Sequence, residues 1–517
     1  MRIATNVSAI VSNNALQKSQ DRLTKSIARL SSGYKINSSS DDAAGYAISE
    51  KMRLQLRGLN QADNNAADGV SVLHTAEGAM EEIQSMLARM KELSVQAANG
   101  TNSVDERSAI QSEIDSLNSE IDRISSNTEF NSQTLISGNL SRRVYSNYEG
   151  VNQIEVSDNF VAGNYGITIT QDARQAIVVG NGAVTMSDTA TVTKEQAGTI
   201  SMNGYGIEIS EGDTLAGIMG KLVDGADKIG GRVFAITAGA TNDTKANGTD
   251  YAGYEPQTSY AGNNIVFMTK ESGSSKTMNI TCSNAELANM LGIATAATDG
   301  GMYAEGSDVQ AEFTLDNDGK RVGFADSAVI STSGTRVTVK DVNNRTFVTD
   351  VPSNVAGTQF SDTAKADDKS TATSTQTAKV TQEVTDVGTM SVHVGANENQ
   401  VILIDIPAVT SYTLGTENLN VMTEITASEA IDTIDTAVAY ANRVRSQMGA
   451  YENRFEHTTN NLGTASENLT SAISTMTDTD MAEEMTEYTS LNVMTQAATS
   501  ILAQANERPS TVLQILQ

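Results

Sequence analysis

The sequence predicts an α+β multidomain protein in which the N- and C-terminal segments together form an α-helical coiled-coil bundle and the middle is β-rich. Apolar residues recur at intervals of seven near both termini, which is the spacing of a helical seam. From about residue 140 the chain changes to short Val, Ile and Tyr runs separated by Gly, Asn and Asp, as strands and turns require. Aromatic residues make up only 4% of the chain, which suits thin cores of helices and small sheets.

Residues 1 to about 130 are predicted to form three helices with breaks near 31–37 and 99–102. Their apolar stripes include Leu16, Leu23, Ile27 and Leu30 in the first helix. The third helix has a start signal, because Ser103 followed by Glu106 fits a capping box. As isolated helices, the first 30 residues would be marginally stable, so we expect assembly to fold them.

The C-terminal part carries the longest unbroken seam. Its members are Ile434, Ala441, Met448, Phe455, Leu462, Leu469 and Met476, with Ile431, Val438 and Ile473 at companion positions. The stripes at the two ends each need a partner, so we expect the chain to fold back on itself. The predicted helix begins near residue 428 and would be roughly 115 Å long if it continued to residue 505, but the acidic cluster at 478–480 is expected to interrupt it.

The last segment continues the apolar pattern with Ile501 and Leu502 and closes on Leu513 and Leu516. Each buried Leu or Ile contributes about 1.5 to 3 kcal/mol. These side chains are therefore expected to be buried against a neighbouring molecule.

The middle is predicted to hold strands at 165–169 and 265–268. Residues 203–236 read as strand, short helix and strand, which indicates a small α+β module. The Thr- and Asp-rich stretch 361–386 is expected to be an exposed loop or an ordered strand edge.

Charge and composition exclude several classes of protein. The 63 acidic residues outnumber the 35 basic ones, for a net charge of −28, so nucleic acid would be repelled. Membrane insertion is not expected, because no stretch approaches the roughly 18 uninterrupted apolar residues of a membrane helix. The single Cys282 cannot form an intramolecular disulfide and is expected to be a small buried residue. The N-terminus lacks the pattern of a cleaved secretory signal, which on these grounds alone indicates a cytoplasmic protein.

The sequence contains no strong candidate for a catalytic, metal or cofactor site. The histidines His74, His393 and His457 are far apart in sequence, so a surface position is favoured over metal binding. Pairs such as 41–42 and 81–82 are typical of solvated faces or caps. The helical spacing of Met80, Met86 and Met90 favours core packing. We therefore expect no enzyme, no cofactor and no metal.

Both ends of the chain resemble bacterial flagellin. The N-terminal match includes LSSGYKIN at 30–37, DDAAG at 41–45, LRGLNQA at 56–62 and KELSVQAANGTN at 91–102, and the C-terminal match includes GAYENRF at 449–455, SENL at 466–469 and the ending 512–517. A weaker resemblance links residues near 203–215 to an insert of flagellins and hook-associated proteins.

The resemblance implies a structural subunit that polymerises into the extracellular filament for swimming motility and is exported through the flagellum's type III channel without a cleaved signal, which replaces the cytoplasmic interpretation. It assigns residues 1–40 and 478–517 to an inner helical tube, 41–175 and 415–477 to an outer-tube bundle with a β-hairpin, and 176–414 to a variable, surface-exposed region. Expected partners are further copies of the chain, an export chaperone, and the hook-filament junction and cap proteins.

The resemblance also implies a candidate contact with the innate receptor Toll-like receptor 5. Arg89, Leu93 and Glu113 match the family's receptor motif, and Arg89 and Leu93 are four residues apart on one helical face. The competing interpretation is subunit packing, with Arg89 and Glu113 as an ordinary ion pair between helices.

Two alternative functions stay open at this stage. A hook-filament junction or cap protein shares helical ends, but such proteins generally lack the 91–102 motif together with both family termini. A secreted adhesin or an enzyme, such as a protease insert, could be carried on a flagellin-like scaffold, but no catalytic motif in the sequence supports one.

Overall fold

The computed structural model describes residues 6–157, 160–238, 256–293, 301–316, 318–341, 345–357, 359–361, 368–369, 371–374, 377–385 and 387–516. They form two compact units. The first unit contains 1–70, 392–402 and 453–517, and the second contains 71–391 and 403–452.

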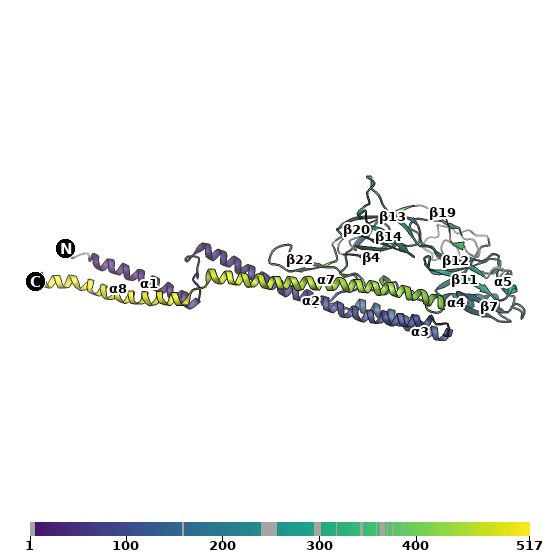
Figure 1. Ribbon diagram of the computed structural model, residues 1–517, viewed down its shortest axis with the longest axis horizontal. Coiled ribbons are helices and arrows are strands. Elements are labelled where there is room, and N and C mark those ends of the chain that lie inside the picture. Colours follow the sequence, from purple (N-terminus) through teal and green to yellow (C-terminus); the bar gives the residue numbers. More distant parts are fainter. Residues whose placement is uncertain are drawn as a thin grey trace. The chain divides into compact units, whose positions relative to one another are not determined.

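Long helices dominate both ends of the chain, as the heptad spacing predicted (Figure 1). The N-terminal helices are α1 (Val7–Ser32), α2 (Ala43–Ala97) and α3 (Val104–Asn127), and the C-terminal ones are α7 (Glu424–Thr477) and α8 (Met481–Leu516). Helix α3 starts at the predicted capping box, in which the Ser103 hydroxyl accepts from the Glu106 backbone N–H and the Glu106 side chain accepts from the Ser103 N–H. None of the helices among the described residues combines the length and apolarity needed to cross a membrane.

The breaks after α1 and before α8 pair with each other. The backbone N–H of Lys35 donates to the Thr477 carbonyl at 2.7 Å, and that of Thr479 donates to the Gly33 carbonyl at 2.9 Å. Gly33 ends α1 in the left-handed conformation, at φ 76°, which glycine adopts without a Cβ clash. The predicted interruption at 478–480 is therefore confirmed, and its backbone is satisfied by the break on the other side of the chain.

The C-terminal seam is buried over most of its length. In the second unit Ile434, Ala441 and Met448 are at most 2% exposed. On α2 the side chains of Met80 and Met90 are fully buried, which confirms them as core residues, whereas Met86 is half-buried. In the first unit the Phe455 ring is fully buried, and a Cβ added to Gly69 would lie 2.9 Å from its Cζ atom, so glycine at this position permits the close approach of α2.

The end of α3 leads into a tight hairpin of β1 (Glu129–Phe130) and β2 (Gln133–Thr134). Its two turn residues, Asn131 and Ser132, both have positive φ, at 51° and 65°, as the two-residue turns that match the strand twist require.

The middle of the chain contains two four-stranded sheets, whose strands come from both sides of residues 175–306 in the sequence. One has the order β13-β5-β20-β3 and the other β14-β15-β16-β4. Their strands are β3 (Val144–Ser146), β4 (Asn152–Val156), β5 (Gly163–Gln171), β13 (Gln310–Phe313), β14 (Val329–Ser333), β15 (Arg336–Lys340), β16 (Thr346–Asp350) and β20 (Ala378–Val384). Residues of both sheets share one apolar core, which includes Tyr165 and Phe347; we call this pair of sheets the sandwich. The predicted strand at 165–169 lies within β5.

A second core belongs to an α+β module of residues 175–306. A five-stranded sheet has the order β18-β12-β11-β7-β8, and a three-stranded sheet has the order β6-β10-β9. The elements are β6 (Gln175–Val179), β7 (Gly198–Met202), β8 (Tyr205–Ile209), α4 (Leu215–Lys228), β9 (Gly231–Ile236), β10 (Asn264–Ser272), β11 (Thr277–Cys282), α5 (Ala285–Met290) and β12 (Met302–Glu305), with β18 (Asp368–Lys369) added at one edge. The strand, helix and strand order predicted for 203–236 is confirmed in β8, α4 and β9.

Short elements complete the fold. They are β17 (Gln359–Ser361), β19 (Thr371–Ser374), β21 (Met390–His393), β22 (Val401–Ile404) and α6 (Ser411–Leu414). Strands β17 and β19 pair, as do β21 and β22. In the described part of 361–386 the chain forms β18, β19 and β20. The expectation of an exposed loop or strand edge is wrong for β20, which lies between β5 and β3 with Val380 and Val384 buried.

Candidate functional site

Helices α1 and α8 lie side by side and leave many apolar side chains in solvent (Figure 1). The exposed apolar side chains of this pair are Val7, Ile10, Val11, Ile27, Met481, Met485, Val493, Met494 and Ile501. Specific polar contacts hold the pair together. The Asn6 side chain donates to the Ala505 carbonyl at 2.9 Å, and Arg29 lies 3.6 Å from Glu484. Two helices are too thin to bury this much apolar surface, and such a patch marks an interaction surface.

The predicted assembly residues divide by helix. On α1, Leu16, Leu23 and Leu30 are half-buried and Ile27 is 48% exposed. On α8, Leu502 is half-buried and Ile501 is 55% exposed.

On α7, Leu462 and Ile473 are buried and Leu469 is half-buried. The side chains of Leu513 and Leu516 lie outside the described residues. The predicted set is therefore partly core of the single chain, as at Leu462, and partly surface that awaits a neighbour, as at Ile501.

Arg89 and Glu113 form an ion pair between α2 and α3. The Arg89 Nη2 lies 2.9 Å from Glu113 Oε1, and Nη1 lies 3.2 Å from Glu92 Oε2. The bonds to Glu113, and then to Glu92, raise the pKa of Arg89. Arg89 and Glu113 are exposed, whereas Leu93 is only 2% exposed. Arg89 and Glu113 are therefore brought together at the surface. Leu93 is buried, so its side chain adds almost nothing to the exposed surface formed by that pair.

The residues expected to be chemically inert show ordinary structural roles. Glu81 is exposed, and Asp42 accepts from the backbone N–H groups of Ala44 and Gly45 at the start of α2. Cys282 is half-buried rather than fully buried, and burial raises the pKa of its thiol.

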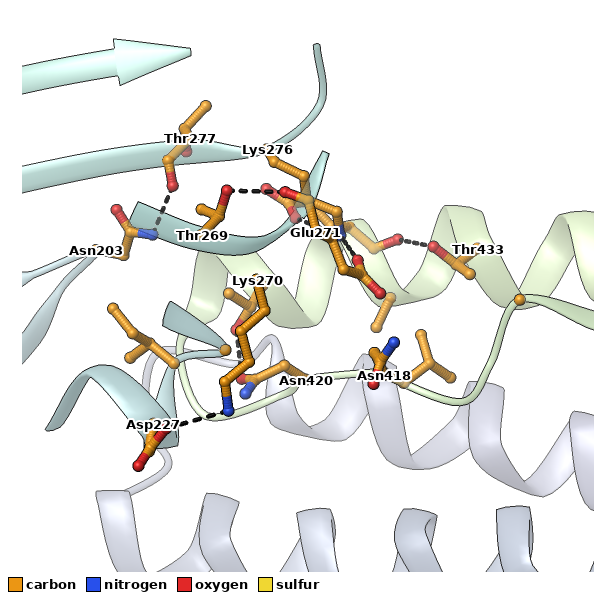
Figure 2. A pocket seen from close by; sticks show the side chains of 17 residues that line it. Asn203, Asp227, Thr269, Lys270, Glu271, Lys276, Thr277, Asn418, Asn420 and Thr433 are labelled. Carbon is orange, nitrogen blue, oxygen red and sulfur yellow. Dashed lines mark hydrogen bonds and ion pairs between the residues drawn. The ribbon is translucent and has the colours of Figure 1, made fainter. Parts of the chain in front are cut away.

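A cavity of about 200 Å³ lies between the α+β module, the loop at 415–420 and the start of α7. Figure 2 shows Lys276 directed toward Glu271. The Lys276 Nζ lies 2.8 Å from Glu271 Oε2 and 3.5 Å from Glu429 Oε2. Lys270 pairs with Asp227 at 3.1 Å, and the Asn420 side chain donates to the Lys228 carbonyl.

This cavity is better explained as a polar joint than as a ligand site. Its lysines already have carboxylate partners, and the described residues that line it include no aromatic side chain. The joint connects chain segments about 150 residues apart, so sequence spacing offered no signal for it.

Known protein families match the helical segments at both ends of the chain. The model of the bacterial flagellin N-terminal helical region matches residues 3–141, and that of the C-terminal helical region matches residues 431–516. A flagellin of Clostridium tyrobutyricum is 30% identical over 96% of this chain and 98% of its own length. A flagellin of Salmonella typhimurium is 31% identical over 100% of this chain and 99% of its own length. A solved FliC structure from Burkholderia pseudomallei covers 75% of this chain and 99% of its own, at 14% identity and a TM-score of 0.22, too low to support an argument.

The two flagellins match nearly the whole chain, including the middle. Flagellins are structural proteins that form the extracellular flagellar filament. The chain belongs to the bacterial flagellin family, as a structural subunit of the filament.

Proposed function

We propose that α1 and α8 form the inner layer of the filament, with residues 1–40 and 478–517 in an inner tube. Residues 41–175 and 415–477 then form the outer tube, and 176–414 face outward. The observation that carries this proposal is the row of exposed apolar side chains on α1 and α8. Packing against neighbouring copies would bury this surface and stabilise the filament by about 25 cal/mol for each Å² of apolar area removed from water.

The proposal is tested by seeded polymerisation of a variant with a charge on this row. Ile501 is 55% exposed in the single chain, so Ile501→Asp should leave the helical content of the monomer unchanged and abolish filament elongation. Thr499→Asp is the matched control, because Thr499 is exposed and two positions away, on another face of α8. Normal elongation of the Ile501→Asp chain would contradict the assignment.

The proposal extends to the other partners of a filament subunit. We infer export without a cleaved signal, and contact of the terminal helices with an export chaperone and with the hook-filament junction and cap proteins. The family assignment and the exposed apolar row support this, since an unpolymerised subunit would have to keep that row from aggregating. The proposed role is structural and involves no catalysis. If a chaperone protects this row, Ile501→Asp should bind it more weakly than Thr499→Asp does.

We also propose that the exposed pair of Arg89 and Glu113 is available to the receptor named by the family motif, Toll-like receptor 5. Leu93 is buried, so its side chain would not contact the receptor directly. Arg89→Ala should weaken binding of the monomer to the receptor ectodomain by about tenfold or more if Arg89 is a hot spot. Arg123→Ala, which removes an exposed arginine paired with Glu120 on α3, is the control. Equal affinity of Arg89→Ala and wild type, with helicity intact, would leave Arg89 as a packing residue.

A further inference from the structure

Three side chains from α2 and α7 converge on one point of the second unit. His74 and Glu77 lie three residues apart on α2, and Glu452 lies on α7. The His74 Nε2 is 3.6 Å from Glu452 Oε1. One ligand atom from each of the three residues lies within 4.8 Å of the other two.

This arrangement has the donor set and the spacing of a zinc site. Zinc binds imidazole nitrogen and carboxylate oxygen at about 2.0 to 2.2 Å, so neighbouring ligand atoms on a tetrahedral ion lie about 3.4 Å apart. The separation between His74 and Glu452 is already close to that value, and a ligand atom of Glu77 lies within 4.8 Å of both. A histidine and a glutamate three positions apart on one helix, facing a glutamate on another helix, is also how helical bundles hold metal ions.

Solvent can reach the three side chains, but Arg445 competes with a metal ion for Glu77. The side chains of His74 and Glu452 are 59% and 40% exposed, so an ion can enter from solvent and keep water at its fourth position. With a neutral imidazole the three ligands carry two negative charges. Arg445 Nη2 lies 3.2 Å from Glu77 Oε1, and it must give up this contact when Glu77 turns toward an ion. The bond between Arg445 and the Gln84 side chain would keep the guanidinium in place.

We propose that His74, Glu77 and Glu452 form a zinc-binding site that bridges α2 and α7, with Arg445 limiting its affinity. This revises the expectation of no metal ligand, which rested on the distance between histidines in the sequence. Spacing along the chain could reveal the pair 74 and 77 but not the third ligand, which lies 375 residues further on. A proton on the imidazole competes with a metal ion for the same nitrogen, so zinc binding should weaken in acid.

The test is calorimetric titration of the full-length monomer with zinc chloride in a buffer near neutral pH. One equivalent should bind and raise the unfolding temperature, because a ligand of the folded state stabilises it. His74→Ala and Glu452→Gln should each weaken binding about tenfold or more. The control is His457→Ala, since His457 is also exposed on α7 but belongs to no three-ligand group within the described residues. Zinc binding that is absent, or equal in wild type and His74→Ala, would overturn the site.

Two further arms separate a built site from general attraction to an acidic surface. Arg445→Gln frees Glu77 and should tighten zinc binding several-fold, whereas Arg443→Gln removes the same charge from α7 next to a different partner, Glu155, and should change it less. Equal effects of the two changes would show that Glu77 is not a ligand. Magnesium chloride should bind far more weakly than zinc, because magnesium disfavours imidazole. Equal binding of the two ions would also overturn the proposal.

Discussion

At the scale of single residues, the charge of Lys276 is shared by two carboxylates. Burial lowers the pKa of the lysine, but Glu271 and Glu429 together outweigh this, so its pKa is raised. The pKa of Glu429 is also raised, because burial outweighs the attraction of Lys276 and Glu271 adds repulsion. Both pKa values are raised, but the upward shift favours the charged form of Lys276 and the neutral form of Glu429. One cation between two carboxylates explains this asymmetry.

Removing the shared cation should therefore destabilise the joint. Lys276→Met should lower the free energy of unfolding by about 2 kcal/mol, between the cost of breaking an exposed pair, under about 1 kcal/mol, and that of breaking a fully buried one, about 3 to 5 kcal/mol. Lys270→Met is the matched control and should cost under about 1 kcal/mol, because Lys270 and its partner Asp227 are 41% and 59% exposed. Urea unfolding of the monomer measures both, and equal losses would contradict the difference in burial.

The raised pKa of Glu429 predicts a pH dependence of definite sign. A carboxyl whose folded pKa exceeds its unfolded value binds protons more tightly when folded, so its contribution to stability is present at low pH. That contribution is lost as the pH rises from about 4.5 through the raised pKa. Glu429→Gln should remove this component and change stability little at neutral pH, since the 2.8 Å pair of Lys276 and Glu271 remains. The difference between the pH profiles of the two proteins tests it, and identical profiles would contradict it.

At the scale of elements, the seam of α7 distinguishes side chains that hold one chain together from those that await a neighbour. Phe455 is fully buried against α2, so Phe455→Ala should cost about 3 to 5 kcal/mol of monomer stability. Glu456→Ala is the control for the same helix turn, and a change of about 0.5 kcal/mol or less is expected at this exposed position. Thermal unfolding followed by far-ultraviolet circular dichroism measures both, and a mild Phe455→Ala would show that this part of the seam is not the core.

The helices were predictable because their information is local. The heptads, the capping box at Ser103 and the acidic break at 478–480 each act over a few residues, and the structure confirms all three. The contacts across the chain were not predictable at the same level. Lys276 and Glu429 lie far apart in sequence, as do His74 and Glu452. Each pair meets only because the folded chain brings distant segments together. The burial of Leu93 was not predicted for a related reason, since a shared helical face does not show which of its side chains pack within one chain.

At the scale of the whole molecule, the two ends of the α+β module lie next to each other. The backbone N–H of Arg174 donates to the Ser307 carbonyl at 2.8 Å, and that of Ser307 donates to the Arg174 carbonyl at 3.0 Å. The module between these residues has its own apolar core. A deletion from about residue 190 to 400 would instead remove β20, which lies between β5 and β3 in the sandwich, and would leave those strands without a partner.

Excision at the paired backbone should therefore remove the module and leave the rest of the chain intact. A chain that lacks residues 175–306, with Arg174 joined to Ser307 through a short glycine linker, should keep the sandwich and the helices and should elongate seeded filaments, because the exposed apolar row lies on α1 and α8. The 190–400 deletion is the comparison, and it should yield less folded monomer because an open sheet edge is prone to aggregation. Electron microscopy after seeding, with circular dichroism of the monomers, measures both. A folded 175–306 deletion that fails to elongate would show that the module takes part in assembly and would move it from the filament surface into the lattice contacts.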